Sequence, residues 1–238
     1  MKIGILATGI TPDEMIPEYG TYADMFVRLF EPLETDFEYR IYEARLGELP
    51  MSADECDGWI ITGSKFSVYE DLDWIRNLKD VARQIQASRK PLVGICFGHQ
   101  LMAEAFGGKV EKYQGGWGVG VHKYRVHGVL ANRLSDRIRV NAVHQDQVTV
   151  LPQGAEVIAS SEFCQYAGLS YDNGRMVSLQ PHPEFTLRFE ADLLNFRGGD
   201  GIPADDAKAG VVTATASDAC VDSPVIAEWL ADVLQKQY

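Results

Sequence analysis

The chain has 238 residues, of which 46% are hydrophobic and 24% are charged. These proportions are typical of a soluble globular protein that can bury a sizeable core. Its formal net charge of -12 disfavours nucleic acids and anionic membranes as partners, because both are polyanions that need clustered cations. The apolar start of the chain is too short for a signal peptide or a spanning helix, which predicts a cytoplasmic protein.

Short apolar runs alternate with helical patterns in the first half of the chain. Strands are expected at 2–7, 37–42, 58–61 and 91–95, and helices at 22–30 and at 74–87, with Asp73 capping the second helix. Strands that alternate with helices indicate a parallel sheet with right-handed crossovers. The expected fold is therefore an α/β fold with an open, doubly wound, mostly parallel sheet flanked by helices. Ligands of such sheets bind at the carboxyl ends of the strands.

The pattern changes after Gly107 and Gly108, which can close a helix at 97–106. Shorter alternating segments at 119–126 and 155–160 predict a small antiparallel part at the edge of the sheet. A helix is expected at 186–195, a glycine-rich loop at 197–203 and a final helix at 223–237. Without repeats or long linkers, the prediction is one domain over 1–238, with 186–238 as a helical C-terminal extension; residues 195–222 receive no role.

A candidate nucleophile lies between the strand at 91–95 and the helix that follows it. Cys96 is flanked by Gly94 and Gly98, the pattern of a nucleophile elbow, in which a sharp turn lifts the reactive side chain above the sheet. The helix N-terminus favours the thiolate there, and the backbone N–H of Phe97 would point at the attacked carbonyl. The alternative is a buried structural cysteine, since free cysteines are often buried.

A second segment, Gln180-Pro181-His182-Pro183-Glu184-Phe185, favours the catalytic interpretation. His182 precedes a proline and should be extended, and residues two apart in an extended chain share a face. His182 and Glu184 can therefore point the same way, as a base and its orienting carboxylate do beside an activated thiol.

The two motifs together resemble those of the class I glutamine amidotransferases. The resemblance covers about 46–185, and the wider family has the layered, flavodoxin-like fold expected above. The similarity is closest to stand-alone members related to the amidotransferase domain of GMP synthetase and to plant γ-glutamyl peptidases, through Thr62-Gly63-Ser64 and the run from Asp71 to Ile75. Thr62 and Pro181 depart from the family pattern, which often has glycine and an aromatic residue at these positions.

The resemblance implies a role for each matching residue. Cys96, His182 and Glu184 form a catalytic triad, and the N–H groups of Gly63 and Phe97 form the oxyanion hole. Gln100, Gly116 and Trp117 contact a small-molecule substrate, glutamine or a γ-glutamyl compound. No cofactor or metal is implied.

The sequence offers little support for a metal site or a nucleotide site. His99 follows Cys96 at a metal-like interval, but no second Cys/His pair completes a zinc site. The sequence lacks a phosphate-binding P-loop, so any ammonia acceptor would be handled by a separate synthetase. The predicted activity is cysteine-dependent hydrolysis of a γ-carboxamide through a thioester. The alternatives are a glutaminase subunit that depends on a partner and a catalytically silent binding protein.

Overall fold

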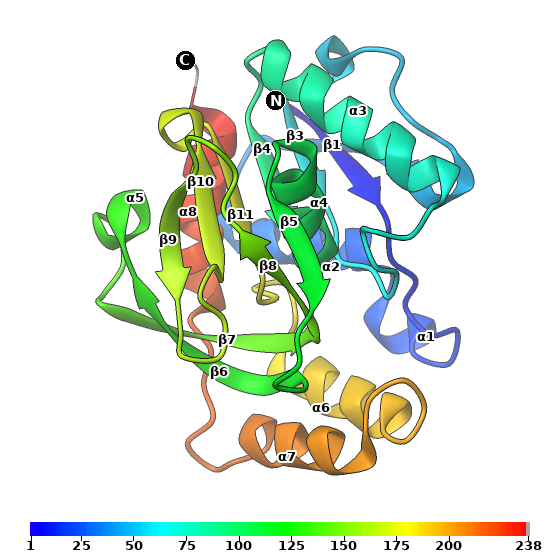
Figure 1. Cartoon of the computed structure of the whole chain (residues 1–238), viewed down its shortest axis with the longest axis vertical. Helices are drawn as coiled ribbons and strands as arrows, with labels where there is room; N and C mark the ends of the chain where they lie inside the picture. The colour runs from blue at the N-terminus through cyan, green and yellow to red at the C-terminus, as the bar shows by residue number, and fades with distance from the viewer. Residues whose placement is uncertain (237–238) are drawn as a thin grey trace.

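The computed structural model describes residues 1–236 of the chain (Figure 1). The strands are β1 (Lys2–Ala7), β2 (Glu38–Glu43), β3 (Gly58–Ile61), β4 (Leu92–Ile95), β5 (Lys109–Lys112), β6 (Gly118–Val126), β7 (Arg137–His144), β8 (Asp146–Val150), β9 (Glu156–Ser160), β10 (Gly168–Tyr171) and β11 (Met176–Leu179). The helices are α1 (Ile16–Tyr19), α2 (Tyr22–Phe30), α3 (Asp73–Ala87), α4 (Phe97–Ala105), α5 (Gly128–Ala131), α6 (Leu187–Arg197), α7 (Ala204–Ala214) and α8 (Ser223–Gln235).

One sheet organises the fold, with the strand order β2-β1-β3-β4-β11-β10-β9-β6-β7. Strands β2, β1, β3, β4 and β11 run parallel, and the strands beyond β11 continue the sheet in antiparallel pairs. Strands β5 and β8 form a separate antiparallel pair. The α/β class, the parallel sheet and the antiparallel part at its edge are as the sequence predicts.

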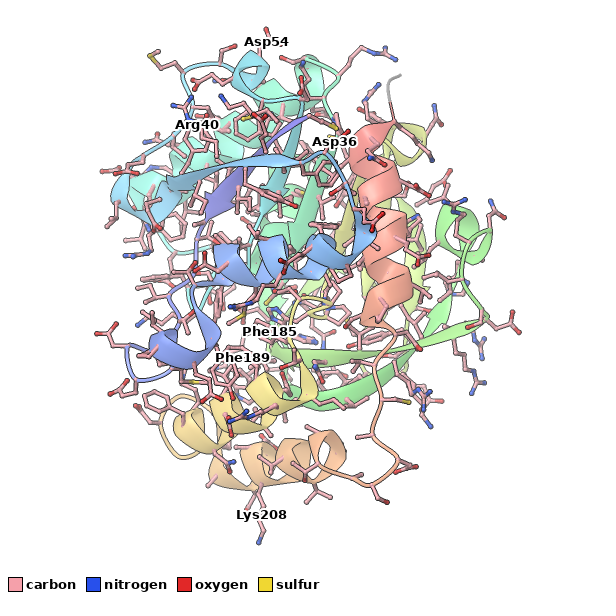
Figure 2. The ribbon with its side chains drawn as sticks, turned by 180° about the vertical axis from the view of Figure 1, so that it is seen from behind. Asp36, Arg40, Asp54, Phe185, Phe189 and Lys208 are labelled. Carbon is pink, nitrogen blue, oxygen red and sulfur yellow. The ribbon has the colours of Figure 1, made fainter. Side chains whose placement is uncertain are left out.

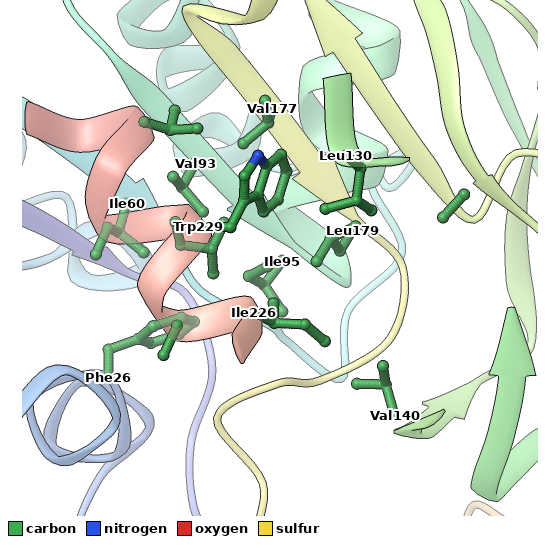
Figure 3. Close-up of a cluster of buried hydrophobic side chains, with 14 of the residues drawn as sticks. Phe26, Ile60, Val93, Ile95, Leu130, Val140, Val177, Leu179, Ile226 and Trp229 are labelled. Atoms are coloured by element: carbon green, nitrogen blue, oxygen red, sulfur yellow. The ribbon is translucent and has the colours of Figure 1, made fainter. Parts of the chain in front are cut away.

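The parallel strands β1, β3, β4 and β11 are buried on both faces, whereas the edge strand β2 is largely exposed. Alternate residues of each strand join different clusters: Ile60 packs with α2 and α8 on one face, whereas Trp59 and Ile61 pack with α3 and α4 on the other. Figure 3 shows the first cluster, with Trp229 of α8 lying against side chains of β4 and β11. The carboxyl ends of β3, β4 and β11 therefore lie at an edge of the sheet, between the two helical layers.

Two expectations about the helices are corrected. Asp73 does not cap α3: it is the first helical residue, Leu72 holds the cap position, and the Asp73 carboxylate pairs with Arg76 instead. Helix α7 was not predicted, because its Ala- and Asp-rich sequence carries only a weak apolar stripe. The final helix starts at Ser223 as expected and runs to Gln235; the expected last residue, Gln237, lies outside the described residues.

Helices α6 and α7 lie side by side at one end of the molecule, against β6 (Figure 1). Their contact with the strand is unusually close. Gly120 has a φ of 80°, and a Cβ there would overlap Thr213, while the Val121 N–H donates to the Thr213 hydroxyl at 3.0 Å. A Cβ on Gly210 would lie 3.1 Å from the Gly120 nitrogen. Small residues on both sides thus seat α7 on the sheet.

None of the helices within residues 1–236 has the length and apolar character needed to span a bilayer.

Candidate active site

Cys96 lies in the tight turn that joins β4 to α4. Its φ of 52° and ψ of -102° are strained for a residue with a side chain. The turn also requires the two flanking glycines. A Cβ on Gly98 would overlap the Ile61 carbonyl oxygen, and a Cβ on Gly94 would lie 2.7 Å from the Gly98 carbonyl oxygen. The backbone is held by the Cys96 N–H, which donates to the Leu179 carbonyl at 2.8 Å. The geometry is that of a nucleophile elbow.

His182 reaches the same place from the neighbouring strand. Strands β4 and β11 are parallel and pair Gly94 with Ser178, so their carboxyl ends meet at one edge. The His182 N–H donates to the Asn141 carbonyl at 2.8 Å, and the Asn141 side chain donates to the Phe185 carbonyl at 2.8 Å. The Phe185 ring stacks on the imidazole with 4.0 Å between ring centroids. Backbone and ring contacts therefore fix the imidazole in one orientation.

Glu184 holds one nitrogen of the His182 ring. The ring Nδ1–H donates to Glu184 Oε1 at 2.8 Å, and both side chains are buried. Burial by itself lowers the pKa of His182, but the Glu184 carboxylate and interactions with Cys96, including a hydrogen bond, outweigh it and raise that pKa well above its ordinary value. Since Nδ1 is taken by Glu184, Nε2 is the nitrogen left for Cys96.

The turn after β3 brings Gly63 close to this pair. A Cβ on Gly63 would lie 2.8 Å from His182 Cε1 and 3.5 Å from Cys96 Cβ. The turn is locked by two buried threonines: the Thr8 N–H donates to the Thr62 hydroxyl at 3.0 Å, and the Thr8 hydroxyl donates to the Gly63 carbonyl at 3.0 Å. Thr62 stands where the family pattern often has glycine. Its hydroxyl ties this turn to the end of β1, which gives the threonine a structural role.

Phe97 contributes its backbone rather than its side chain. The ring is fully buried and stacks on Trp74, with 5.4 Å between ring centroids. Its N–H is the first of α4, where no intrahelical partner exists. Neither this N–H nor that of Gly63 has a protein acceptor within residues 1–236. Both donors are therefore available to a ligand beside Cys96.

A cavity of about 330 Å³ opens over Cys96 and His182. Its volume lies in the range that holds small-molecule ligands. Its wall is built by the start of α2, the turn after β3, the elbow with α4, the end of β5 with the segment before β6, β7 and β8, the segment after β11, and α6 with the loop that follows it. Residues of the wall include Tyr22, Ser64, Lys65, Ser67, Gln100, Lys112, Trp117, His144, Asp146, Phe185, Leu193, Arg197 and Ile202.

The three expected substrate contacts lie differently. Gln100 lines the cavity, but its amide N–H₂ already donates to the Asp146 carbonyl at 2.9 Å and to Gln180 Oε1 at 3.0 Å, which leaves only its oxygen for a ligand. Trp117 also lines the cavity. Gly116 does not line it, and borders an adjoining hollow instead.

His99 has a structural setting. It is fully buried in α4, and its Nδ1 bonds the Ser178 hydroxyl at 2.8 Å, which ties α4 to β11. Burial lowers its pKa to about 3, so the ring is neutral at physiological pH. Among the described residues, no group of three His, Cys, Asp or Glu side chains is arranged to hold a metal ion.

Several residues of the site were not found from the sequence. Asp146 follows His144 by two positions and accepts from the hydroxyls of Ser67 at 2.5 Å and Tyr69 at 3.1 Å. Arg197 and Ile202 come from the C-terminal segment, which had no assigned role. No local motif marks these residues, because Asp146 meets Ser67 and Tyr69 only across the fold, and Arg197 and Ile202 reach the cavity only when α6 and α7 pack on β6.

The fold and the site define a class of proteins that is also visible in comparisons with known chains. The family model for glutamine amidotransferase class-I matches residues 15–198, most of the chain. The chain belongs to the class I glutamine amidotransferase family.

Individual relatives fall into two groups. The chain is 30% identical over 210 residues to γ-glutamyl peptidase 3 of Arabidopsis thaliana, covering 82% of this chain and 83% of the relative. It is 34% identical over 138 residues to the glutamine-hydrolysing GMP synthase of Aromatoleum aromaticum, but covers only 26% of that larger protein. A solved glutamine amidotransferase of Thermotoga maritima shares the fold, with a TM-score of 0.74, 21% identity, and coverage of 98% of this chain and 96% of that one.

Proposed function

We propose that this protein hydrolyses the γ-carboxamide of glutamine or of a γ-glutamyl compound, through a thioester on Cys96. The observation that carries the proposal is the meeting of three features around Cys96: the strained elbow, the buried His182–Glu184 hydrogen bond, and the neighbouring residues Gly63 and Phe97, whose backbone N–H groups have no protein acceptor within residues 1–236. A purely structural cysteine would need none of them.

In the proposed reaction, Cys96 Sγ attacks the amide carbon and its proton passes to His182 Nε2. The carbonyl oxygen becomes an oxyanion that accepts hydrogen bonds from the N–H groups of Gly63 and Phe97, each contributing about 3 to 4 kcal/mol in the transition state. His182 then donates the proton to the leaving nitrogen, the C–N bond breaks, and ammonia or an amine departs. Glu184 keeps the imidazole in the required tautomer and stabilises its charged form.

A water molecule completes the cycle. His182 takes a proton from that water as it attacks the thioester carbon, and the C–S bond breaks to release glutamate and the Cys96 thiol. The raised pKa of His182 supports this scheme, because a base that holds its proton in the buried site can stabilise a Cys96 thiolate beside it.

The cavity wall and one relative favour a self-contained hydrolase over a subunit that depends on a synthetase. Leu193, Arg197 and Ile202 of this chain supply part of the cavity wall, so this part of the wall needs no partner. The Arabidopsis relative, of which the chain covers 83%, is a γ-glutamyl peptidase. We therefore propose that the isolated chain turns over a γ-glutamyl amide.

The test is steady-state release of ammonia or amine by the purified chain, with glutamine, γ-glutamyl methylamide and a set of γ-glutamyl dipeptides. Activity well above that of a Cys96→Ser variant is expected for at least one compound. If all compounds stay at that background and activity appears only when a synthetase is added, the partner-dependent glutaminase is correct. If the protein binds such compounds tightly but never cleaves them, it is a binding protein.

A further inference from the structure

The turn that carries Gly63 depends on a side chain from another strand. Thr8 follows β1 directly and is fully buried. Its hydroxyl lies 2.8 Å from the Thr62 carbonyl oxygen and 3.0 Å from the Gly63 carbonyl oxygen, and it donates to both in a shared hydrogen bond. No backbone N–H within residues 1–236 donates to either carbonyl. Side chains therefore hold the carbonyls of this turn, and Thr8 reaches both.

The contact with the Thr62 carbonyl also fixes the direction of the Gly63 N–H. The two groups belong to one trans peptide plane, in which C=O and N–H point in opposite directions. Strand β3 lies between β1 and β4 in the sheet. Thr62 faces β1 with both backbone groups, since its N–H donates to the Leu6 carbonyl at 3.2 Å and its carbonyl accepts from Thr8. The Gly63 N–H therefore points to the β4 side, where Cys96 follows the strand.

The other side chains of the turn complete the same network. The Thr62 hydroxyl accepts from the Thr8 N–H at 3.0 Å and donates to the Gly63 carbonyl at 3.2 Å. The Ser64 hydroxyl donates to the Thr8 carbonyl at 2.7 Å. Thr8 thus contacts all three residues of the turn, through its side chain and both of its backbone groups.

Packing fixes the segment that follows β1 from its other side. Gly9 lies so close to the turn that a Cβ on it would be 2.3 Å from the Gly63 carbonyl oxygen and 2.4 Å from the Tyr22 ring. Tyr22 packs on Phe185, with 5.5 Å between ring centroids, and Phe185 stacks on His182. Figure 2 shows Phe185 between α2 and α6. The segment is therefore clamped between the turn and an aromatic cluster that reaches the proposed base.

We infer that Thr8 is a positioning residue for the proposed oxyanion hole, because its hydroxyl holds the Thr62–Gly63 peptide with the Gly63 N–H toward a substrate carbonyl at Cys96. The inference rests on the proposed function. Thr8 does not line the cavity, so it acts only through the Gly63 N–H. An oxyanion donor stabilises the transition state more than the bound substrate, so loss of the Thr8 hydroxyl should lower kcat and leave KM nearly unchanged.

Thr8→Val tests the inference, because valine keeps the shape of threonine and removes the hydroxyl. The buried Thr62 carbonyl then loses its donor, and the peptide is free to leave the required orientation. We expect kcat on the best γ-glutamyl substrate to fall by about 10- to 100-fold, with KM within about threefold, since the donor is misplaced rather than deleted. Thr8→Ser keeps the hydroxyl and should restore most of the lost kcat.

Alkylation of Cys96 by iodoacetamide separates this role from general damage to the site. The reaction needs an accessible thiolate but forms no oxyanion. Its rate at Cys96, followed by mass spectrometry, should therefore be the same in Thr8→Val and the wild-type protein. Thr11→Val is the matched control, because Thr11 is buried in the same segment and its hydroxyl has no hydrogen-bond partner within residues 1–236. This variant should keep the wild-type kcat and KM.

Two results would overturn the inference and leave the hydrolase intact. One is an unchanged kcat in Thr8→Val, and the other is an alkylation rate that falls as much as kcat, because Thr8 would then support the site as a whole. If Thr8→Val does not fold, Thr8→Ser and Thr8→Ala make the same comparison, since they differ by the hydroxyl oxygen alone, and equal kcat values in the two would contradict the inference. A wild-type protein that hydrolyses neither glutamine nor any γ-glutamyl compound would overturn the proposed function, and the inference with it.

Discussion

The elbow at Cys96 and the wall made by α6 and α7 are both parts of the candidate site, but they are built in opposite ways. The elbow is local: β4, the turn and α4 are consecutive, and Gly94 and Gly98 sit within two residues of Cys96. The wall is remote, because Arg197 reaches the cavity only when α6 and α7 pack on β6, more than 70 residues earlier in the chain. We therefore expect the elbow to determine whether chemistry occurs and the wall to determine which substrate is accepted.

The largest effect is expected at the residues that complete the elbow's chemistry. His182→Ala should lower kcat by about 1,000-fold or more, because it removes the proposed base, whereas Glu184→Gln should cost less, because it removes only the group that orients that base. Steady-state kinetics on the best γ-glutamyl substrate measure both changes. A greater loss in Glu184→Gln than in His182→Ala, at equal folding stability, contradicts these roles.

A pair of glycine substitutions separates the two regions by their effect on folding. Gly98→Ala places a Cβ on the Ile61 carbonyl in the middle of the parallel sheet, and should cost more than about 3 kcal/mol of global stability. Gly120→Ala places a Cβ on Thr213 and strains a φ of 80°, so α7 should detach while β1 to β4 remain folded.

Urea unfolding and limited proteolysis distinguish these outcomes. Gly98→Ala should shift the whole unfolding transition, whereas Gly120→Ala should expose cleavage sites in 198–216 with a smaller shift. If Gly120→Ala destabilises the whole protein as much as Gly98→Ala does, α7 does not unfold independently of the parallel sheet and this prediction is wrong.

The smallest expected effect concerns a buried carboxyl within the wall. Glu190 of α6 is fully buried, its Oε1 accepts from the Gly120 N–H at 2.9 Å, and burial raises its pKa to about 8 from an ordinary 4.5. The folded protein thus keeps a proton that the unfolded chain loses, so this group makes stability fall as pH rises between about 4.5 and 8. The loss amounts to as much as about 3 kcal/mol between pH 5 and pH 8.

Glu190→Gln keeps the hydrogen-bond acceptor and removes the titration, so its free energy of unfolding should change less between pH 5 and pH 8 than that of the wild-type protein. Urea unfolding at the two pH values measures this difference. Glu228→Gln, which removes an exposed carboxyl of α8, is the control. An identical pH dependence in Glu190→Gln and the wild-type protein would show that Glu190 is ionised in the folded state.

The contrast between elbow and wall also explains how much the sequence could predict. Strands β1 to β4, helices α2, α3 and α4, and the turn at Cys96 were predicted because short-range apolar periodicity and glycine placement encode them, whereas β11 was not predicted. The pairing of His182 with Glu184 followed from the alternation of an extended chain. Helix α7 and the place of Arg197 in the cavity wall were not predictable, because they depend on the fit of Gly210 against Gly120 across the fold, which no local pattern records.

The central claim is that Cys96 is the residue acylated by substrate, and covalent labelling tests it most directly. The protein should be treated with a diazoketone analogue of glutamine and its peptides analysed by mass spectrometry. Burial raises the pKa of Cys56 and brings that of Cys164 to about 12, so neither should compete, and half-buried Cys220 is the internal comparison. The account predicts stoichiometric modification of Cys96 with complete loss of activity. Modification of Cys56, Cys164 or Cys220 with Cys96 untouched would contradict it.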